Sequence, residues 1–226
     1  MGKAPVSAKG LFNATGKKRR PVARQISQNE YVMDDAGLER EADDFYPTTP
    51  PEPGEAIIWA EQPRLRQLGM IWEPAVGDGA LLAQLQGNGF YTFASDLVQR
   101  GAAEVVKDWY AFAEPPAGVR AALTNPPWAE CHKDPGWIRH GMQTLGLEYM
   151  ALLLPLNWLG AINRAKLWEQ YPPARIYVMR WRVDFTGQGG SPMITCWVVW
   201  DRAYKGETLI RMLDRKSVSE PELFQG

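Results

Sequence analysis

The sequence predicts an α/β fold built on a largely parallel sheet, and three observations lead to this expectation. From about residue 43 onward, short apolar runs alternate with helical patterns. The run YMALLLPL (149–156) is almost continuously apolar, as in a strand that is covered on both faces. A glycine turn at 77–79 lies between the first apolar run and a helical pattern. With 226 residues and a hydrophobic share of 45%, the chain suits one domain with a buried core.

Seven segments have the length and composition of strands. They are MIWEP (70–74), FYTFASD (90–96), AEVVKDW (103–109), VRAALTN (119–125), YMALLLPL (149–156), RIYVMRWRV (175–183) and ITCWVVWD (194–201). The last two are joined through FTGQGGSP, a connection that favours antiparallel pairing. The expected architecture is therefore a mostly parallel seven-stranded sheet with an antiparallel last strand and helices on both faces.

Helical patterns separate several of these strands. The predicted helices cover 57–68, which Pro63 could break, 80–86, which stops at Gly87, and 161–170. A further helix is expected to begin at Asp134 and Pro135, an N-cap followed by proline at the first helical position. Ile138, Met142 and Leu145 then recur at helical spacing, and His140 would lie at the surface or edge of this helix.

The N-terminal region has a strongly asymmetric charge. Seven lysines and arginines and no acid precede Glu30, whereas nine acids and one base lie between Glu30 and Glu55. We predict that residues 1–30 form a disordered basic arm and that 31–226 form the folded domain. Taken alone, the charges of this arm favour the interpretation that it is a solubilising tail. The alternative is an arm that contacts phosphates, with Lys17, Lys18, Arg19 and Arg20 as the candidate residues.

Composition also limits the cellular setting. The N-terminus lacks the apolar core of a signal peptide, and the longest apolar run is too short to cross a bilayer. Cys131 and Cys196, the only cysteines, cannot form a disulfide framework, which favours a reducing cytoplasm. Cys131 and His132 adjoin each other, but no second pair lies at ligand spacing, so no metal site is expected.

The segment EPAVGDGALL (73–82) ends a strand and opens a helix. Gly77 and Gly79 let the backbone turn tightly and approach a ligand, and Asp96 at the end of the next strand is placed to accept ribose hydroxyls. The phosphate-binding pattern GxGxxG is absent because position 82 is leucine. These residues favour a ligand that has a ribose but no pyrophosphate.

Asp108 and Trp109 end the third predicted strand. An acid here can accept from an adenine amino group, and an aromatic ring can stack on the base. The alternative is that Asp108 simply ends the strand and Trp109 is a core residue. For Trp197 and Trp200, a position in the core or on the sheet face is favoured over a platform for a base. Together with the glycine turn and Asp96, the pair suggests an adenosine-shaped pocket at the carboxyl edge of the sheet.

The stretch TNPPW (124–128) follows the fourth predicted strand. Pro126 and Pro127 carry no amide hydrogen, so this corner offers acceptors and few donors. The side-chain oxygen of Asn125 and the carbonyl of Pro126 could accept both hydrogens of one exocyclic amino group. Trp128 could supply a flat face for the base, worth about 1–3 kcal/mol per stacked base. Such a site catalyses by positioning and electrostatics, without a nucleophile or a metal.

These segments resemble motifs of the class I S-adenosylmethionine-dependent amino-methyltransferases, and most of all those of the DNA N6-adenine methyltransferases. EPAVGDGAL, Asp96, KDWY and TNPPW are similar to motifs I to IV, while DDFYPTTPP (43–51) is similar to motif X and RWRVDFTGQGGSPM (180–193) to the loop that lines the target-base pocket. The resemblance covers about residues 43–214 and implies a Rossmann-like class I methyltransferase fold with S-adenosylmethionine as cofactor.

The resemblance also assigns roles to residues. The implied cofactor-binding residues are Tyr46, Thr48 or Thr49, Glu73, Pro74, Gly77, Gly79, Asp96, Leu97, Asp108, Trp109 and Asn125. The implied catalytic residues are Asn125, Pro126, Pro127 and Trp128, with Trp128 and Phe185 holding the target base. The motif order is that of the gamma arrangement.

The implied activity is methyl transfer to N6 of adenine in DNA, on a flipped-out base. Alternatives are the same chemistry on RNA adenine, cytosine N4 or a protein glutamine, or a catalytically silent module that binds DNA or a partner. Only about forty residues follow Phe185, so no separate target-recognition domain is expected. Specificity would then be slight, or come from loops, a homodimer or another partner. A compact enzyme of this kind suits the cytoplasm of a bacterium or of a phage-infected cell.

Overall fold

The computed structural model describes residues 31–33, 39–41, 48–132, 136–161, 164–185 and 193–215. Contacts divide the chain into two compact units, Met1–Asp44 and Phe45–Gly226. In the first unit, β1 (Tyr31–Met33) pairs antiparallel with β2 (Glu39–Glu41). All elements described below belong to the second unit.

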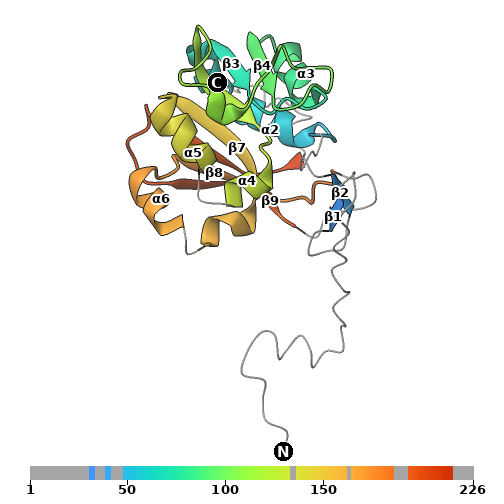
Figure 1. The fold of residues 1–226 in the computed structure, drawn as a ribbon. Helices are drawn as coiled ribbons and strands as arrows, with labels where there is room; N and C mark the ends of the chain where they lie inside the picture. The colour runs from blue at the N-terminus through green and yellow to red at the C-terminus, as the bar shows by residue number, and fades with distance from the viewer. Residues whose placement is uncertain are drawn as a thin grey trace, which may run out of the picture. The chain divides into compact units, whose positions relative to one another are not determined.

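The second unit is built on one eight-stranded sheet (Figure 1). In spatial order its strands are β10 (Leu209–Leu213), β8 (Arg175–Met179), β9 (Thr195–Asp201), β7 (Tyr149–Pro155), β6 (Val119–Thr124), β3 (Met70–Glu73), β4 (Thr92–Asp96) and β5 (Val105–Val106). Strand β9 runs antiparallel to β7 and β8, and every other neighbouring pair is parallel.

The predicted sheet is confirmed with one correction. All seven expected segments contain strands, β3 to β9, and the last two of them pair antiparallel. The count of seven is wrong because β10 adds an eighth strand at the edge, parallel to β8. Four of the five β10 residues are exposed, including Ile210 and Met212. Its sequence, LIRML, is apolar except at Arg211, so the apolar run is short and interrupted, unlike that of the buried strand β7.

Helical segments cover both faces of the sheet, as expected. One face carries α2 (Glu52–Leu68) and α3 (Ala80–Gly87). The other face carries η1 (Trp109–Ala111), α4 (Trp128–His132), α5 (Gly136–Arg139), the π-helix η2 (His140–Thr144), η3 (Leu156–Gly160) and α6 (Ala165–Gln170). Successive residues of β7 point alternately into these two layers: Leu153 packs with the first group and Leu154 with the second.

The helix boundaries differ from the predicted ones for local reasons. Helix α2 begins at Glu52, one residue before Pro53, because proline is well tolerated in the first turn. It continues through Pro63, which lies on the exposed side, where a carbonyl left without its donor can meet water. The 161–170 helix is shorter than expected, as α6 begins at Ala165. The expected start at Asp134 and Pro135 lies outside the described residues.

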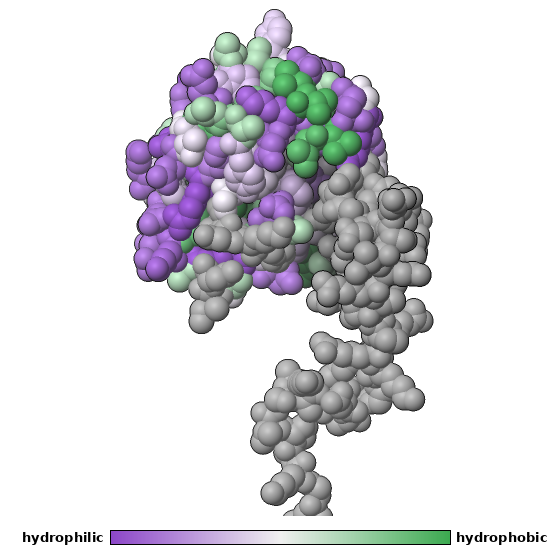
Figure 2. Space-filling view, viewed as in Figure 1, coloured by the Kyte–Doolittle hydropathy of each residue, from purple (hydrophilic) through white to green (hydrophobic). Residues whose placement is uncertain are grey.

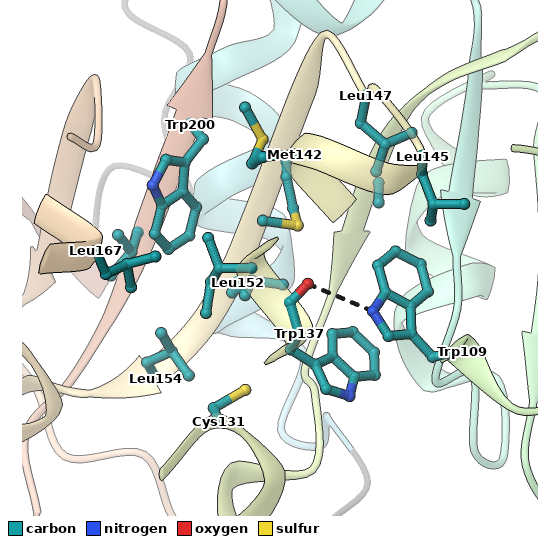
Figure 3. Close-up of a cluster of buried hydrophobic side chains, with 14 of the residues drawn as sticks. Trp109, Cys131, Trp137, Met142, Leu145, Leu147, Leu152, Leu154, Leu167 and Trp200 are labelled. Atoms are coloured by element: carbon teal, nitrogen blue, oxygen red, sulfur yellow. Dashed lines mark hydrogen bonds between the residues drawn. The ribbon is translucent and has the colours of Figure 1, made fainter. Parts of the chain in front are cut away.

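Figure 3 shows a cluster of buried hydrophobic side chains in which Trp109 and Trp137 lie together. Trp109 stacks on Trp137 with ring centroids 4.6 Å apart, and its Nε1 donates to the Trp137 carbonyl at 3.4 Å. Trp72 in β3 packs against Trp109, with ring centroids 4.9 Å apart. Trp197 and Trp200 are also buried, which confirms the expectation that they are core residues.

Hydrophilic side chains dominate the face shown in Figure 2, apart from a compact apolar patch. None of the helices in the described part of the chain has the length and apolarity to cross a membrane. Within the same residues, no group of three or more His, Cys, Asp or Glu side chains could hold a metal ion.

Candidate active site

The parallel register brings the predicted motifs to one edge of the sheet. Strands β4, β3 and β6 are consecutive neighbours and all run in the same direction. Their carboxyl ends carry Asp96, Glu73 and Asn125 respectively, and β5 leads into Asp108 beside β4. Residues up to 52 positions apart in the chain therefore meet where open α/β sheets bind their ligands.

The turn after β3 requires its two glycines. Gly77 has φ +57° and Gly79 has φ +87°, both in the left-handed region that other residues avoid. A Cβ atom at Gly79 would lie 2.8 Å from the Cβ of Ala102. The Gly77 amide donates to Oδ2 of Asp96 at 2.7 Å, which ties the turn to the end of β4. The backbone conformation and one buried carboxylate thus fix the path of the turn.

Substituting Gly79 with alanine should destabilise the fold. A left-handed non-glycine residue costs about 1–3 kcal/mol, and the close approach to Ala102 adds to this. Gly87→Ala is the matched control, because Gly87 ends α3 and a Cβ there meets nothing within 4 Å. Urea unfolding should show a lower midpoint for Gly79→Ala and an equal or higher midpoint for Gly87→Ala. Equal midpoints for the two variants would contradict this interpretation of the turn.

Asp96, the predicted ribose-binding acid, is held by three donors. Besides Gly77, the Val98 amide donates to its Oδ1 at 3.0 Å, and Arg100 forms an ion pair with the same oxygen at 3.3 Å. The carboxylate is thereby fixed at the end of β4, and each of its oxygens has more than one acceptor site. Contact with a ribose stays a prediction. No helix covers Asp96 to Arg100, so no helical spacing in the sequence signalled this pair.

Glu73 is a buried acid with an unsatisfied oxygen. Its side chain is 2% exposed and Oε2 has no hydrogen-bond partner. Burial, together with the nearby carboxylates of Asp78 and Asp96, raises the pKa of Glu73 well above its ordinary value of 4.5. A buried acid beside two further acids disfavours additional negative charge and would be stabilised by a cation. This corner of the edge therefore suits a positively charged ligand group.

The next candidates differ in exposure. Asp108 is exposed and caps η1, with Oδ1 accepting from the Tyr110 amide at 2.8 Å. Leu97 is 61% exposed beside Asp96, so its side chain is available to a ligand. Trp109 is only 4% exposed, and Trp137 covers one face of its ring. The structure thus gives Trp109 the core position that the sequence left open, and stacking on an adenine stays an untested prediction for it.

The TNPPW corner lies between the end of β6 and α4. The Nε1 of Trp128 donates both to Oδ1 of Asn125 at 3.1 Å and to the carbonyl of Leu153 at 2.9 Å. Trp128 is 8% exposed, and its ring meets the ring of Phe185 edge-on at 5.9 Å. The structure therefore brings together three of the residues predicted to handle the target base. Pro126 is buried and Pro127 half-buried beside them.

The Leu153 carbonyl is a part of this site that the sequence did not reveal. Its contribution comes from the backbone of a core strand, and no side-chain pattern signals it. Of the other predicted contacts, Thr48 is buried and Thr49 is exposed just before α2. Tyr46 and the basic residues of the arm, Lys17, Lys18, Arg19 and Arg20, lie outside the described residues.

His140 has a more buried position than a surface helix residue. Its ring lies edge-on to Trp109 and Tyr110, with centroids 5.4 Å away from each. Burial lowers the pKa of His140, and backbone carbonyls at Phe112 and Trp109 offset part of this effect. The lowered pKa favours the neutral form of the His140 ring. The ring therefore has a packing role at the start of the π-helix.

Comparison with known proteins places the fold. No protein-family model matches the sequence, and no curated protein resembles it significantly. Among solved structures, a type I restriction–modification methyltransferase subunit from Streptococcus thermophilus superposes with a TM-score of 0.51 at 15% identity, over 75% of this chain and 47% of that one. The chain thus spans about half the length of that subunit.

Two further solved structures have similar scores. A candidate class I S-adenosylmethionine-dependent methyltransferase from Listeria monocytogenes has a TM-score of 0.51 at 17% identity, over 77% of this chain and 68% of that one. A candidate RNA methyltransferase from Pyrococcus horikoshii has a TM-score of 0.54 at 11% identity, over 69% of this chain and 85% of that one. Taken with the strand order and the antiparallel β9, these likenesses show that the chain has the Rossmann-like fold of the class I methyltransferases.

Proposed function

We propose that this protein transfers a methyl group from S-adenosylmethionine to the exocyclic N6 amino group of an adenine in DNA. The observation that carries the proposal is the acceptor corner of Asn125 and Pro126, which lies at the same sheet edge as the glycine turn, Glu73 and Asp96. The fold shared with methyltransferases of known structure supports methyl transfer as the type of reaction.

The described residues fit the proposed cofactor. S-adenosylmethionine has a cationic sulfonium and an ammonium group, and Glu73 offers a buried acid with a free oxygen at the glycine turn. Its ribose would contact Asp96, and its adenine would contact Leu97 and Asp108, which are both exposed. When bound, this cofactor supplies an electrophilic methyl group.

The chain itself would orient the target nitrogen. Oδ1 of Asn125 and the carbonyl of Pro126 each accept one amino hydrogen, which directs the nitrogen lone pair towards the cofactor side. Pro126 and Pro127 keep competing amide donors away from these acceptors. The nitrogen loses a proton after it has gained the methyl group, so no general base is needed before transfer.

One feature favours DNA over the other substrates. The glutamate–proline start of the glycine motif resembles the DNA enzymes more than those that methylate ribosomal RNA or release factors, whereas the TNPPW corner supports amino-group methylation as a class. Tritium transfer from labelled S-adenosylmethionine should be strongest to unmethylated DNA, weaker to RNA and absent with glutamine peptides. N6-methyladenine formed only in RNA would refute the DNA assignment. Failure to bind the cofactor in calorimetry would favour a silent binding module.

The arrangement around Glu73 predicts a pH-dependent stability. A carboxyl group whose folded pKa is raised binds more protons in the folded state than in the unfolded state between the two pKa values. Its contribution therefore favours folding below pH 4.5 and is lost as the pH rises through the folded pKa. Glu73→Gln, which stays neutral, should gain stability relative to the wild type as the pH rises from 4.5 to 8, as measured by urea unfolding. A difference between the two proteins that is independent of pH would contradict this.

The basic arm, residues 1–30, gives a further prediction about DNA. We propose that Lys17, Lys18, Arg19 and Arg20 contact phosphates, while residues 31–226 form the catalytic domain. Deleting residues 1–29 should then reduce the slope of log affinity against log salt by about 4, at about 0.9 per phosphate contact. Fluorescence anisotropy with a DNA duplex at several salt concentrations measures this slope, and an unchanged slope would return the arm to the role of a solubilising tail.

A further inference from the structure

We propose that Trp128 is a positioning residue, whose indole N–H fixes the Asn125 side chain and fastens the TNPPW corner to strand β7. This inference rests on the proposed methyl transfer and deepens it. The expected role of Trp128 is a flat surface for the base, which any aromatic residue could provide. A second role falls to the indole nitrogen, a hydrogen-bond donor that phenylalanine lacks.

The parallel ladder between β6 and β7 ends just before the TNPPW corner. The last parallel pair is Thr124 with Leu152, so residue 125 would lie opposite Leu153 if the ladder continued. In this register the next rung would be donated to the Leu153 carbonyl by the amide of residue 126. Pro126 has no amide hydrogen, and the Nε1 of Trp128 takes its place at 2.9 Å. The indole thus satisfies a buried carbonyl that the proline would leave unpaired.

The indole of Trp128 also forms a hydrogen bond to Asn125. The same N–H lies 3.1 Å from Oδ1 of Asn125. Because an indole nitrogen only donates, the atom of Asn125 that faces it must be the oxygen and not the amide nitrogen. This determines which end of the side-chain amide faces the indole. The corner thereby holds the acceptor in one orientation before the base arrives.

The ring of Trp128 is packed in the core. Trp128 is 8% exposed and meets Phe185 edge-on, at an interplanar angle of 84°. Packing of this kind holds the indole in place, so that its N–H direction is set by the core. Phenylalanine at position 128 would preserve an aromatic ring but would remove the N–H that donates to the Leu153 carbonyl and to Oδ1 of Asn125.

Kinetics of Trp128→Phe separate the two roles. If the N–H positions Asn125, kcat for DNA methylation should fall about tenfold while KM for DNA changes by less than about twofold. Trp200→Phe is the matched control, because it also removes an indole donor, to the Tyr171 carbonyl at 2.9 Å. Trp200 lies opposite Met150 at the start of β7, away from the carboxyl ends of the parallel strands. The kcat of Trp200→Phe should equal that of the wild type. A wild-type kcat for Trp128→Phe would overturn the inference.

A double-variant cycle tests whether Trp128 acts through Asn125. In an Asn125→Ala background, Trp128→Phe should reduce the residual kcat much less than it does in the wild type, since the positioned group is already gone. Equal fold reductions in both backgrounds would show that the ring acts independently of Asn125 and would overturn the inference.

A spectroscopic measurement keeps this inference distinguishable from the proposed function. In full-length protein labelled with 15N at tryptophan, the Trp128 indole resonance is assigned through its absence in Trp128→Phe. Asn125→Ala should shift this resonance and leave that of Trp200 unchanged. A Trp128 resonance that does not respond would overturn the inference, whatever the substrate is. If the resonance responds but DNA is not methylated, the DNA assignment fails instead, and the kinetic cycle is run on the amino substrate that the tritium assay identifies.

Discussion

Asn125→Ala should lose nearly all methyl transfer, with kcat lower by about 10²–10³-fold, the loss typical of removing one preorganised polar group that stabilises a transition state. The side-chain oxygen is one of only two acceptors proposed to orient the amino nitrogen, and alanine leaves Pro126 as the other. Single-turnover tritium transfer to DNA, with S-adenosylmethionine and enzyme both in excess over the DNA, measures the chemical step directly.

Two further variants sharpen this prediction. Asn125→Asp retains acceptor oxygens for both the indole N–H and the substrate, so it should keep more activity than Asn125→Ala. Asn88→Ala serves as a control, because Asn88 is exposed and its Nδ2 donates only to the Gln84 carbonyl at the end of α3. It should transfer methyl groups at the wild-type rate. Undiminished transfer by Asn125→Ala would remove the proposed mechanism.

Arg175→Ala should cause the largest loss of stability of the variants considered, about 3–5 kcal/mol, the cost of leaving a buried charge unpaired. Arg175 lies at the start of β8 and donates to both oxygens of Glu61 in α2, at 2.5 Å and 2.8 Å, and to Asp201 in β9 at 2.9 Å. Glu61 is 3% exposed and also accepts from the Tyr177 hydroxyl at 2.6 Å. Removing the arginine would leave two acids without this partner.

Calorimetry checks this prediction against a matched pair. For a domain of this size the loss corresponds to a fall in melting temperature of about 10 °C. Arg120→Ala removes an arginine of the same type from an exposed pair with Glu148, in which both side chains are more than 40% exposed. Pairs of that kind contribute about 0–1 kcal/mol. Similar melting temperatures for the two variants would show that the Arg175 network is not what joins α2 to the sheet.

Local sequence patterns predicted most of the strands and helices of the fold. The strands β3 to β9 were predictable because each contains a short apolar or β-branched run bounded by turns, and α3 because Gly87 stops a run of leucines on one face. Strand β10 was not predicted, since Arg211 interrupts its short apolar run and its ladder with β8 stabilises it while four of its five residues stay exposed. The ion-pair network was also hidden, because Glu61 and Arg175 lie 114 residues apart and charges alone do not specify partners.

The candidate site was predictable in its residues but not in its bonding. Motif spacing and the parallel order of the strands place Glu73, Asp96 and Asn125 at one edge. The bond from Trp128 to the Leu153 carbonyl depends on the exact register of β6 and β7, which no local pattern encodes. The sequence likewise left open whether Trp109 faces a ligand or the core, because burial is decided by the surrounding indoles.

Nucleoside mass spectrometry of DNA and RNA incubated with S-adenosylmethionine and either wild-type protein or Asn125→Ala tests the central claim most directly. That claim is that the corner of Asn125 and Pro126 presents the amino group of a DNA adenine for methylation. We expect N6-methyladenine in DNA treated with the wild type and almost none in DNA treated with Asn125→Ala. Equal amounts with both proteins, or N6-methyladenine in RNA alone, would contradict it.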